Sequence, residues 1–436
     1  MLKLYVKQAW VLLRQNPQFS TLYIVGTGLA IAMTMLVAEI YYVQLAPVYP
    51  EENRGRTLYL TQANFQAEGT QWNGLFSYAA YRDWVLPLKN KELVTASLAP
   101  WDLESGYIQP GDRSGDFLVQ TKQVDPAFFR VYTFRFLAGN PFTESDLEGG
   151  IHTAVIADDV ARRLFGSAEA AVGQTLSLDF VRYRVCGVVR SGSYLTPKSY
   201  AQVYRPYSVI AGYREAKVPQ FPYVGGFSFT FLVKDDAQAD ALRAEIADVA
   251  RRLNLEHKGE WQMNLWEQPT SHALSVFQAY PEQEFSFWAK VRFFGLLLLV
   301  LLLVPALNLS GLIASRMDSR LAEMGVRKSF GAGRNRLLGQ VMWENLLLTL
   351  LGGLLGLVLA WVFLYAGREW VFTLLQDYAG PMPEGVNAYV SGEMLFAPLV
   401  FLCAFVLCVL LNLLSALLPA WVSLRKPIVY SLFERR

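Results

Sequence analysis

The residue types that most often perform chemistry are sparse in this sequence. It contains three histidines and three cysteines, which are His152, His257, His272, Cys186, Cys403 and Cys408. No histidine stands at metal-ligand spacing from another histidine or from a cysteine. Three cysteines cannot build a disulfide framework, and each lies in an apolar or strand-like run where core packing is the expected role. The sequence therefore predicts no metal centre.

One carboxylate pair and one glycine pair could still belong to a site. Asp158 and Asp159 stand where a helix is expected to begin, so we interpret them as an N-cap that complements the helix dipole. Gly225 and Gly226 are typical of a turn rather than of a phosphate cradle. Neither a G-x-S-x-G element nor a Walker A sequence occurs. We expect no catalytic residues, no cofactor-binding residues and no enzyme activity in this chain.

The composition excludes several broad classes of protein. The chain has 436 residues, of which 53% are apolar and 17% charged, and its formal charge is +2. Its mean hydropathy is +0.24. These values argue against a disordered chain, a collagen-like chain and an ordinary soluble enzyme. The near-neutral charge lacks the basic excess that is typical of nucleic-acid-binding proteins.

The apolar excess is concentrated in four runs. Each is at least as long as the roughly 20 residues that a helix needs to cross the hydrocarbon layer. The predicted spans are residues 17–45, 291–315, 340–367 and 394–422. The first could be a signal peptide, but its apolar stretch is too long and no cleavage site follows, so we favour a retained anchor.

Basic residues predict the orientation of these spans. They are abundant before the first span (Lys3, Lys7, Arg14), in residues 316–336 and in the tail, residues 423–436. The loop between the third and fourth spans has Arg368 and four acids. The positive-inside rule places both termini and residues 316–336 in the cytoplasm, and residues 46–288 outside. Residues 1–16 are amphipathic, which favours an interfacial helix over a cytoplasmic extension of the first span.

The outer segment has the composition of an α/β domain. Strands are predicted at residues 57–61, 92–98, 104–109, 116–124, 153–156, 175–180, 183–189, 226–234 and 260–265, and helices at 77–89, 158–165 and 236–253. Units of β-α-β lie at both ends, as in a split βαβ layer. We expect a ferredoxin-like lobe at about 50–130 and 226–270, and an inserted lobe at about 131–225. The predicted fold class is an α-helical membrane protein with four transmembrane helices and a two-lobed α/β (α+β) extracytoplasmic domain between the first two.

The loop after the second span combines a charged face, an apolar face and a glycine stop. Arg316, Arg320, Glu323 and Arg327 share one helical face, and Glu323 and Arg327 have the favourable i,i+4 order. Gly331 and Gly333 provide a place to end and turn. A short helix is expected to enter the cytoplasm and return to the membrane at about Leu337. This segment is either a loop whose basic side chains extend to the lipid headgroups or a rigid helix that a cytoplasmic partner binds.

Four stretches in this order resemble one known family, the MacB/FtsX-like permeases of ABC transporters. EMGVRKSFGAGRNRLLGQVMWENLLLTLLGGLLGL is similar to the family signature after the second span. VDPAFFRVYTFRFLAGNPFTESD and TAVIADDVARRLFGSAEAAVGQTLSLDFVRYRVCGVV are similar to its periplasmic core domain. ALLPAWVSLRKPIVYSL resembles its ending. The resemblance covers nearly the whole chain.

The resemblance implies a four-span half-transporter of a bacterial inner membrane, working as a homodimer or as a heterodimer with a second permease. Its residues for contact with the ATPase would be Glu323, Met324, Gly325, Arg327, Lys328, Gly331 and Arg334. ATP and Mg²⁺ would bind to a cytoplasmic ABC ATPase, whose hydrolysis drives periplasmic motion. The sequence begins at the membrane helix without a fused ATPase domain, so we expect the ATPase in trans.

Several functions fit this resemblance. The first is export or extraction of a peptide, such as an antimicrobial peptide, or of a lipid-linked or hydrophobic substrate, with a periplasmic partner as a further expectation. The second is a non-transporting signalling subunit that controls a periplasmic cell-wall hydrolase, although over 200 outer residues exceed what that type needs. The third is a lipoprotein-releasing permease, for which no lipoprotein hook is identified.

Two features of the spans leave alternatives open. Glu39 lines a cavity or pairs with a base, or else it lies at the headgroup level, which we favour. Gly352, Gly353 and Gly356 include a small-xxx-small spacing that allows close helix approach. That approach serves either a dimer contact or packing within the chain.

Overall fold

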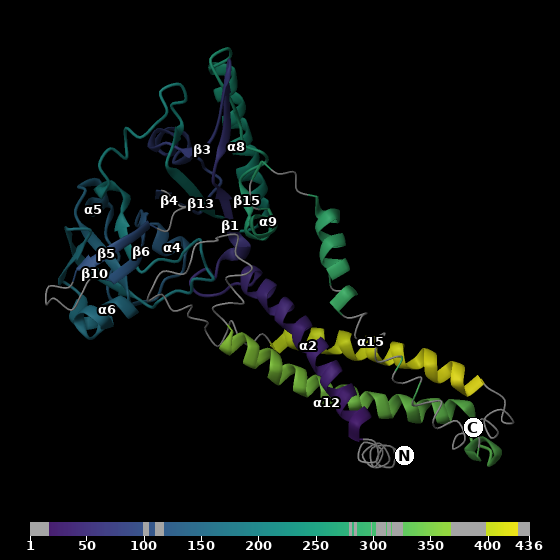
Figure 1. Ribbon diagram of the computed structural model, residues 1–436. Coiled ribbons are helices and arrows are strands. Elements are labelled where there is room, and N and C mark those ends of the chain that lie inside the picture. Colours follow the sequence, from purple (N-terminus) through teal and green to yellow (C-terminus); the bar gives the residue numbers. More distant parts are fainter. Residues whose placement is uncertain are drawn as a thin grey trace. The chain divides into compact units, whose positions relative to one another are not determined.

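The computed structural model describes residues 17–98, 104–109, 117–278, 281–282, 286–297, 299–301, 311, 315, 326–367 and 398–425. The chain divides into two compact units (Figure 1). We call residues 43–285 with 372–391 the outer unit, and residues 1–42, 286–371 and 392–436 the membrane unit. The predicted interfacial helix and the tail after Arg425 lie outside the described residues.

The first lobe of the outer unit has the predicted split βαβ arrangement. Its strands are β1 (Thr57–Leu60), β4 (Leu93–Leu98), β13 (Phe227–Leu232) and β15 (Thr270–Ser271). They pair in the order β15-β1-β13-β4, with every neighbour antiparallel. Helix α8 (Asp236–Glu256) connects β13 to the end of the lobe, and α3 (Tyr78–Ala80) follows β1. The predicted single helix at 77–89 is α-helical only at α3, and a π-helical turn, Tyr81–Val85, follows.

A hairpin and two short strands extend this sheet. They are β2 (Ala63–Ala67), β3 (Thr70–Phe76), β12 (Val224–Gly225) and β14 (Gln262–Asn264). β3 joins the layer through the pair Phe76–Phe227, and β14 pairs with β2. The sequence analysis did not predict β2 and β3, because only part of the hairpin is buried and its apolar alternation is weak.

The second lobe is a closed ring of six strands. They are β5 (Glu104–Gln109), β6 (Phe117–Val124), β8 (Thr153–Ala157), β9 (Thr175–Leu178), β10 (Val181–Val189) and β11 (Val203–Pro206). The order β11-β8-β10-β9-β5-β6 closes because β11 also pairs with β6. A short strand, β7 (Phe136–Gly139), pairs with β10. The strand predicted at 175–180 ends at Leu178, because Asp179 and Phe180 adopt positive φ angles of 50° and 66° in the turn to β10.

Short helices connect these strands. They are α4 (Phe128–Val131), α5 (Glu144–Glu148), α6 (Asp158–Phe165), α7 (Ala168–Ala171) and α9 (His272–Phe277), with 3₁₀ turns at Arg54–Arg56 and Tyr207–Val209. Ile108, Phe117 and Val119 pack with the core of the six-stranded ring. The predicted lobe boundary near residue 131 therefore lies too late in the chain, since β5 and β6 belong to the second lobe.

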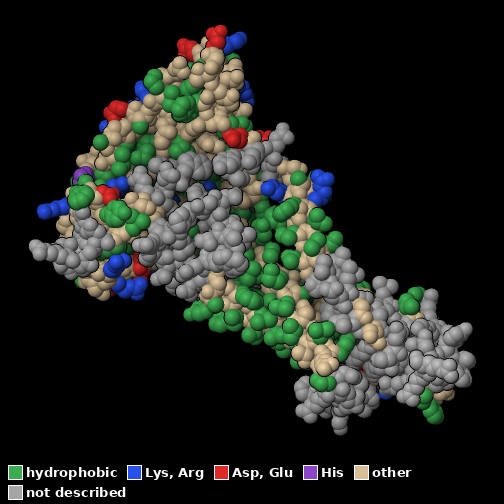
Figure 2. Space-filling view, viewed as in Figure 1, with side chains coloured by type: hydrophobic (Ala, Val, Ile, Leu, Met, Phe, Trp, Pro, Cys, Tyr) green, Lys and Arg blue, Asp and Glu red, His purple; other side chains and the backbone are tan. Residues whose placement is uncertain are grey.

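The membrane unit contains three described helices that are long and apolar enough to cross a membrane. They are α2 (Pro17–Leu45), α12 (Arg334–Ala366) and α15 (Pro398–Arg425), and Figure 2 shows apolar side chains gathered on this part of the chain. Residues 287–297 are also helical, but most of the span predicted at 291–315 lies outside the described residues.

Glycines allow the membrane helices to pack closely within the chain. A Cβ atom at Gly356 would lie 2.6 Å from the carbonyl oxygen of Gly28, and one at Gly352 would lie 2.9 Å from the Cβ of Thr27. A Cβ at Gly353 would meet the ring of Phe405 in α15 at 2.0 Å. The predicted small-residue spacing therefore serves packing of α12 against α2, and its neighbour Gly353 serves packing against α15.

We expect Gly356→Ala to destabilise the chain in detergent by about 1–3 kcal/mol, because the added methyl group meets backbone rather than a movable side chain. The matched control is Gly339→Ala in the same helix, where nothing lies within 4 Å of the new Cβ atom. Alanine favours a helix over glycine, so this control should be neutral or slightly stabilising. Equal unfolding temperatures for the two variants would contradict the packing account.

Candidate functional site

The last turn of α2 is held by side chains of the outer unit. Carbonyl groups at a helix C-terminus have no partner within the helix. Arg54 Nη1 donates hydrogen bonds to the carbonyl oxygens of Val43 at 2.6 Å and Ala46 at 2.7 Å. His272 Nε2 donates to the carbonyl oxygen of Gln44 at 2.8 Å. Arg54 is 4% exposed and His272 5%, so these three hydrogen bonds are shielded from water.

The first lobe brings these two side chains together. Arg54 begins the 3₁₀ turn that leads into β1, and His272 begins α9 directly after β15. Because β1 and β15 are paired, with Leu58 opposite Ser271, both residues lie at one end of the same two strands. Ser271 caps α9 by accepting a hydrogen bond from the Leu274 amide, which fixes where the helix begins.

Glu51 connects this helix cap to the second lobe. Its carboxylate pairs with Arg54 Nε at 2.9 Å and accepts hydrogen bonds from the amide and hydroxyl of Ser199, at 3.0 and 2.9 Å. Ser199 lies just before β11 of the six-stranded ring. Burial alone would raise the pKa of Glu51, but Arg54 and the hydrogen bonds outweigh it and lower the pKa. One ionised carboxylate therefore contacts the helix cap and the ring.

His272 is neutral in this setting. Burial lowers its pKa from 6.5 to about 4, against the nearby charge of Glu51. Since Nε2 carries the proton that is donated to Gln44, Nδ1 accepts from the hydroxyl of Tyr59 at 3.0 Å. We call Glu51, Arg54, Tyr59 and His272 the helix-cap cluster. The sequence showed His272 only as a histidine without metal-ligand spacing.

A second positive charge lies close to this cluster. Lys122 Nζ donates to the carbonyl oxygens of Pro197 at 3.1 Å and Lys198 at 2.8 Å. Burial lowers the pKa of Lys122 to about 7, while the charge of Glu51 opposes that shift. The 197–199 segment is thus held from β6 and from the helix-cap cluster together.

The segment predicted to contact an ATPase is described from Val326 onward. Residues 326–329 are helical, and Gly331 has a φ of 84°, a conformation that glycine adopts without strain. The amide of Ala332 donates to the carbonyl of Arg327, and the amide of Gly331 to that of Lys328, both at 3.0 Å. This is a Schellman ending, so the predicted glycine stop is present. Gly333 then precedes α12.

Arg327 anchors this segment to α12. Its Nη1 donates to Gln340 Oε1 at 2.7 Å, and Gln340 Nε2 donates to Glu344 Oε1 at 3.3 Å. Gln340 is 9% exposed and Glu344 5%. The sequence analysis predicted a pair with Glu323, which lies outside the described residues, and it missed Gln340 and Glu344. The signal in the sequence was the i,i+4 spacing of Gln340 and Glu344 beside an apolar run, which places both polar side chains on one face of the helix.

A large, strongly exposed apolar residue of this segment was also missed. Phe330 is 87% exposed and Val326 46%, so a large apolar side chain stands beside the glycine stop. Lys328 is half-buried. Glu323, Met324, Gly325, Lys3, Lys7 and Arg14 lie outside the described residues, as does the side chain of Arg334.

Glu39 is fully buried against other residues of the chain. Two other predictions are corrected by the structure. Asp158 begins α6 as expected, but the N-cap residue is Ala157, and Asp158 instead accepts from the amide of Ser191 at 2.8 Å. Gly225 lies in β12, where a Cβ atom would be 2.5 Å from the Cα of Ser77, so it permits close approach rather than a turn. Among the described residues, no group of three metal-ligating side chains occurs.

Family comparisons agree with this arrangement of outer and membrane units. The description "MacB-like periplasmic core domain" matches residues 20–249, which is more than half of the chain, and "FtsX-like permease C-terminal" matches residues 295–428. The chain belongs to the MacB/FtsX-like permease family. This MacB/FtsX-like chain is thus a membrane permease with a periplasmic α/β domain.

Curated relatives are longer proteins. The macrolide export ATP-binding/permease protein MacB of Escherichia coli K12 is 24% identical over 348 residues, which cover 76% of this chain and 47% of the relative. MacB of Shigella flexneri matches over the same shares. The chain spans about half the length of the curated relatives it matches.

Two solved structures are similar to about half of the chain at low sequence identity. The periplasmic region of MacB from Actinobacillus actinomycetemcomitans has 18% identity and a TM-score of 0.35, covering 52% of this chain and 95% of that one. A domain of a putative permease from Porphyromonas gingivalis has 14% identity and a TM-score of 0.35, covering 48% and 89%.

We expect the stability of the permease to fall by about 2 kcal/mol between pH 7 and pH 5 through His272 alone. Its folded pKa lies below the unfolded value, so the unfolded chain binds more protons in this range and acid favours unfolding. His272→Gln should lose less stability than wild type over the same change. His257→Gln, at a partly exposed histidine beside Glu260, is the control and should behave as wild type. If the free energy of unfolding fell equally with pH in wild type and in His272→Gln, the neutral, capping role of His272 would be contradicted.

Proposed function

We propose that this chain is the permease subunit of an ABC transporter of the mechanotransmission type. ATP hydrolysis in a separate cytoplasmic ATPase, which binds ATP and Mg²⁺, drives a movement of the membrane helices. The periplasmic domain follows this movement and exports or extracts a peptide, lipid-linked or hydrophobic substrate. The chain itself performs no hydrolysis in this proposal.

The helix-cap cluster is the observation that carries the proposal. A helix that only anchors a domain needs no more than a flexible linker at its end. Here the final carbonyl groups of α2 are bonded by buried side chains within the outer unit, and Glu51 extends the bonding to the second lobe. In this proposal, a movement that reaches the last residues of α2, which belong to the outer unit, moves both lobes with them.

The cytoplasmic end has features that suit a contact with an ATPase. We assign this contact to Glu323, Met324, Gly325, Arg327, Lys328, Gly331 and Arg334, and add Phe330, whose exposed ring can enter an apolar socket. Arg327 also bonds to Gln340, and through it to Glu344, so a push on this segment reaches α12 directly. Helix α12 packs against α2 through Gly356 and Gly28.

The remaining parts of the proposal concern assembly. The permease works in a bacterial inner membrane with both termini cytoplasmic, as a homodimer or with a second permease. Its partners are the ATPase, the lipid bilayer and a periplasmic protein, and nucleic acid is not among them. The basic residues Lys3, Lys7 and Arg14 contact headgroups at the inner interface.

The test is to reconstitute the permease with the ABC ATPase that copurifies with it and to follow hydrogen exchange of the outer unit. In wild type, ATP should change exchange in the outer strands. Arg54→Gln keeps a polar side chain but shortens it and removes the charge, so the carbonyl groups of Val43 and Ala46 lose their donor. We expect this variant to bind the ATPase and hydrolyse ATP while the ATP-driven change in the outer unit is lost.

Arg56→Gln is the matched control, because Arg56 lies two residues away, is partly exposed and pairs with Glu92. It should transmit the change as wild type does. Absence of any ATP-driven change in wild type, or full transmission by Arg54→Gln, would refute the proposal.

A further inference from the structure

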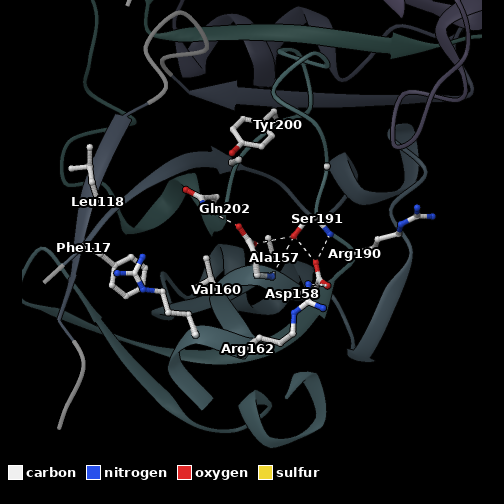
Figure 3. Close-up of a pocket in the computed structure, with 14 residues that line it drawn as sticks. Phe117, Leu118, Ala157, Asp158, Val160, Arg162, Arg190, Ser191, Tyr200 and Gln202 are labelled. Carbon is white, nitrogen blue, oxygen red and sulfur yellow. Dashed lines mark hydrogen bonds and ion pairs between the residues drawn. The ribbon is translucent and has the colours of Figure 1, made fainter. Parts of the chain in front are cut away.

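The second lobe contains a cavity of about 440 Å³, lined in part by Phe117 and by α6 (Figure 3). Charged groups of this lining are bonded within the chain. Asp158 pairs with Arg162 at 2.6 Å, and the guanidinium carbon of Arg163 lies 3.7 Å from the ring centroid of Phe117. These internal contacts give the cavity no sign of a ligand. A turn on the outer surface of the same lobe has a different character.

The turn between β9 and β10 has a backbone conformation that suits glycine. Its two central residues, Asp179 and Phe180, adopt positive φ angles of 50° and 66°, and Leu178 pairs with Val181 on either side of them. Two positive φ angles are the mark of a type I′ hairpin turn, in which glycine is favoured at the second central position. A phenylalanine at that position is strained, because its Cβ atom crowds the backbone.

The strained side chain is directed into solvent. Phe180 is 86% exposed, so packing within the chain does not compensate for the strain. Two further apolar side chains, Tyr107 at 56% and Val181 at 38%, are exposed beside it. Tyr107 lies on the neighbouring strand β5, where its carbonyl accepts from the amide of Asp179 at 3.0 Å and its amide donates to Asp179 Oδ1 at 2.9 Å. We call Tyr107, Phe180 and Val181 the turn patch. Strain that brings no packing benefit points to a function outside the fold.

Two arginines follow the turn patch on the outer face of β10. Tyr183 and Val185 pack in the core of the six-stranded ring, so Arg182 and Arg184, which alternate with them, face outward. Both arginines are exposed, and neither forms an ion pair with a residue that the structure describes. Asp179, the acid of the turn, is held against β5 by its bond to the amide of that strand. The surface therefore combines exposed apolar side chains with an excess of positive charge.

We propose that the turn patch, with Arg182 and Arg184, binds an anionic lipid surface. Phe180 and Val181 enter the boundary between headgroups and acyl chains, and the ring of Tyr107 lies at the level of the headgroups, where amphipathic aromatic side chains are favoured. Arg182 stands two residues from Phe180, about 7 Å along the strand. The headgroup layer is about 5–8 Å thick, so its guanidinium group meets the lipid phosphates.

Two observations favour a lipid surface over a folded protein as the occupant. The apolar part of this surface is confined to three side chains, and Thr175 and Ser177 on the adjacent strand β9 are polar, whereas a stable protein interface needs about 800 Å² from each partner. The outer unit is also tethered to a membrane by α2, which ends within it, so lipid is present at a high effective concentration. The lipid contact goes beyond the proposed coupling role and does not depend on it.

The test uses the full chain in phosphatidylcholine liposomes with or without phosphatidylglycerol, and no ATPase is present. The native cysteines, Cys186, Cys403 and Cys408, are replaced by alanine. An environment-sensitive fluorophore is attached either to Tyr107→Cys in the turn patch or to Leu137→Cys, an exposed apolar position on β7 of the same lobe. Nitroxide groups carried by lipid headgroups quench a fluorophore that touches the lipid surface.

We expect quenching and blue-shifted emission at position 107 but not at position 137 when phosphatidylglycerol is present. Quenching should fall about twofold or more without phosphatidylglycerol, and also in about 1 M salt, which shortens the Debye length to about 3 Å. Arg182→Gln combined with Arg184→Gln should cause the same loss. Arg251→Gln combined with Arg252→Gln removes equal charge from exposed positions of α8 and should leave quenching unchanged.

Phe180→Gly separates lipid contact from stability. Glycine relieves the strain of the positive φ angle, so the unfolding temperature should rise while quenching at position 107 falls. Ile151→Ala removes another exposed apolar side chain of the second lobe and should leave quenching unchanged. Because Phe180→Gly is expected to be the more stable chain, its loss of quenching does not reflect a loss of fold.

Absence of quenching at position 107 with phosphatidylglycerol present would overturn the inference. So would equal quenching in pure phosphatidylcholine, or in the variant that lacks both Arg182 and Arg184. A blue shift without nitroxide quenching would show that the turn patch contacts protein, such as a second copy of this chain, and would overturn the inference as well.

Discussion

The bond between Arg54 and the end of α2 is the constraint on which the rest of the account depends. A helix that leaves a membrane presents unpaired carbonyl groups, and a buried guanidinium satisfies two of them here. The positive charge of Arg54 also interacts favourably with the negative end of the α2 helix dipole. The buried charge of Arg54 is balanced by the carboxylate of Glu51, and that carboxylate accepts a hydrogen bond from Ser199. The cap is therefore bonded to both lobes.

The strand pairing of the outer unit positions the residues that form this junction. The pairing of β1 with β15 brings residues 54 and 272 together although more than 200 positions separate them in the chain. The closed ring places the 197–199 segment against Glu51, and Lys122 of β6 holds that segment in place. Within the membrane unit, Arg327, Gln340 and Glu344 form a comparable polar link between a turn and α12.

Elements with strong local patterns could be predicted from the sequence, whereas long-range polar contacts could not. α6 has the predicted bounds because two acids, two arginines and a closing glycine mark its ends, and α8 extends only three residues past its predicted end. Gly331 ends its turn as predicted, since a positive φ favours glycine strongly. The helix-cap cluster could not be predicted, because only the Glu51–Arg54 pair is local in sequence, whereas His272 reaches this pair only after folding. The closed ring was missed for the same reason: the pairing of β6 with β11 joins distant segments.

The central claim is that the cap on the last residues of α2 holds both lobes of the outer unit in one bonded junction. Spin labels at Trp72 of β3 in the first lobe and Leu137 of β7 in the second, both about half exposed, allow the distance between the lobes to be measured by pulsed electron paramagnetic resonance. With the ATPase present, we expect one narrow distance distribution that is the same with and without ATP, and a broad one in Arg54→Gln. A distribution that shifts with ATP in wild type, or that stays narrow in Arg54→Gln, would contradict the account.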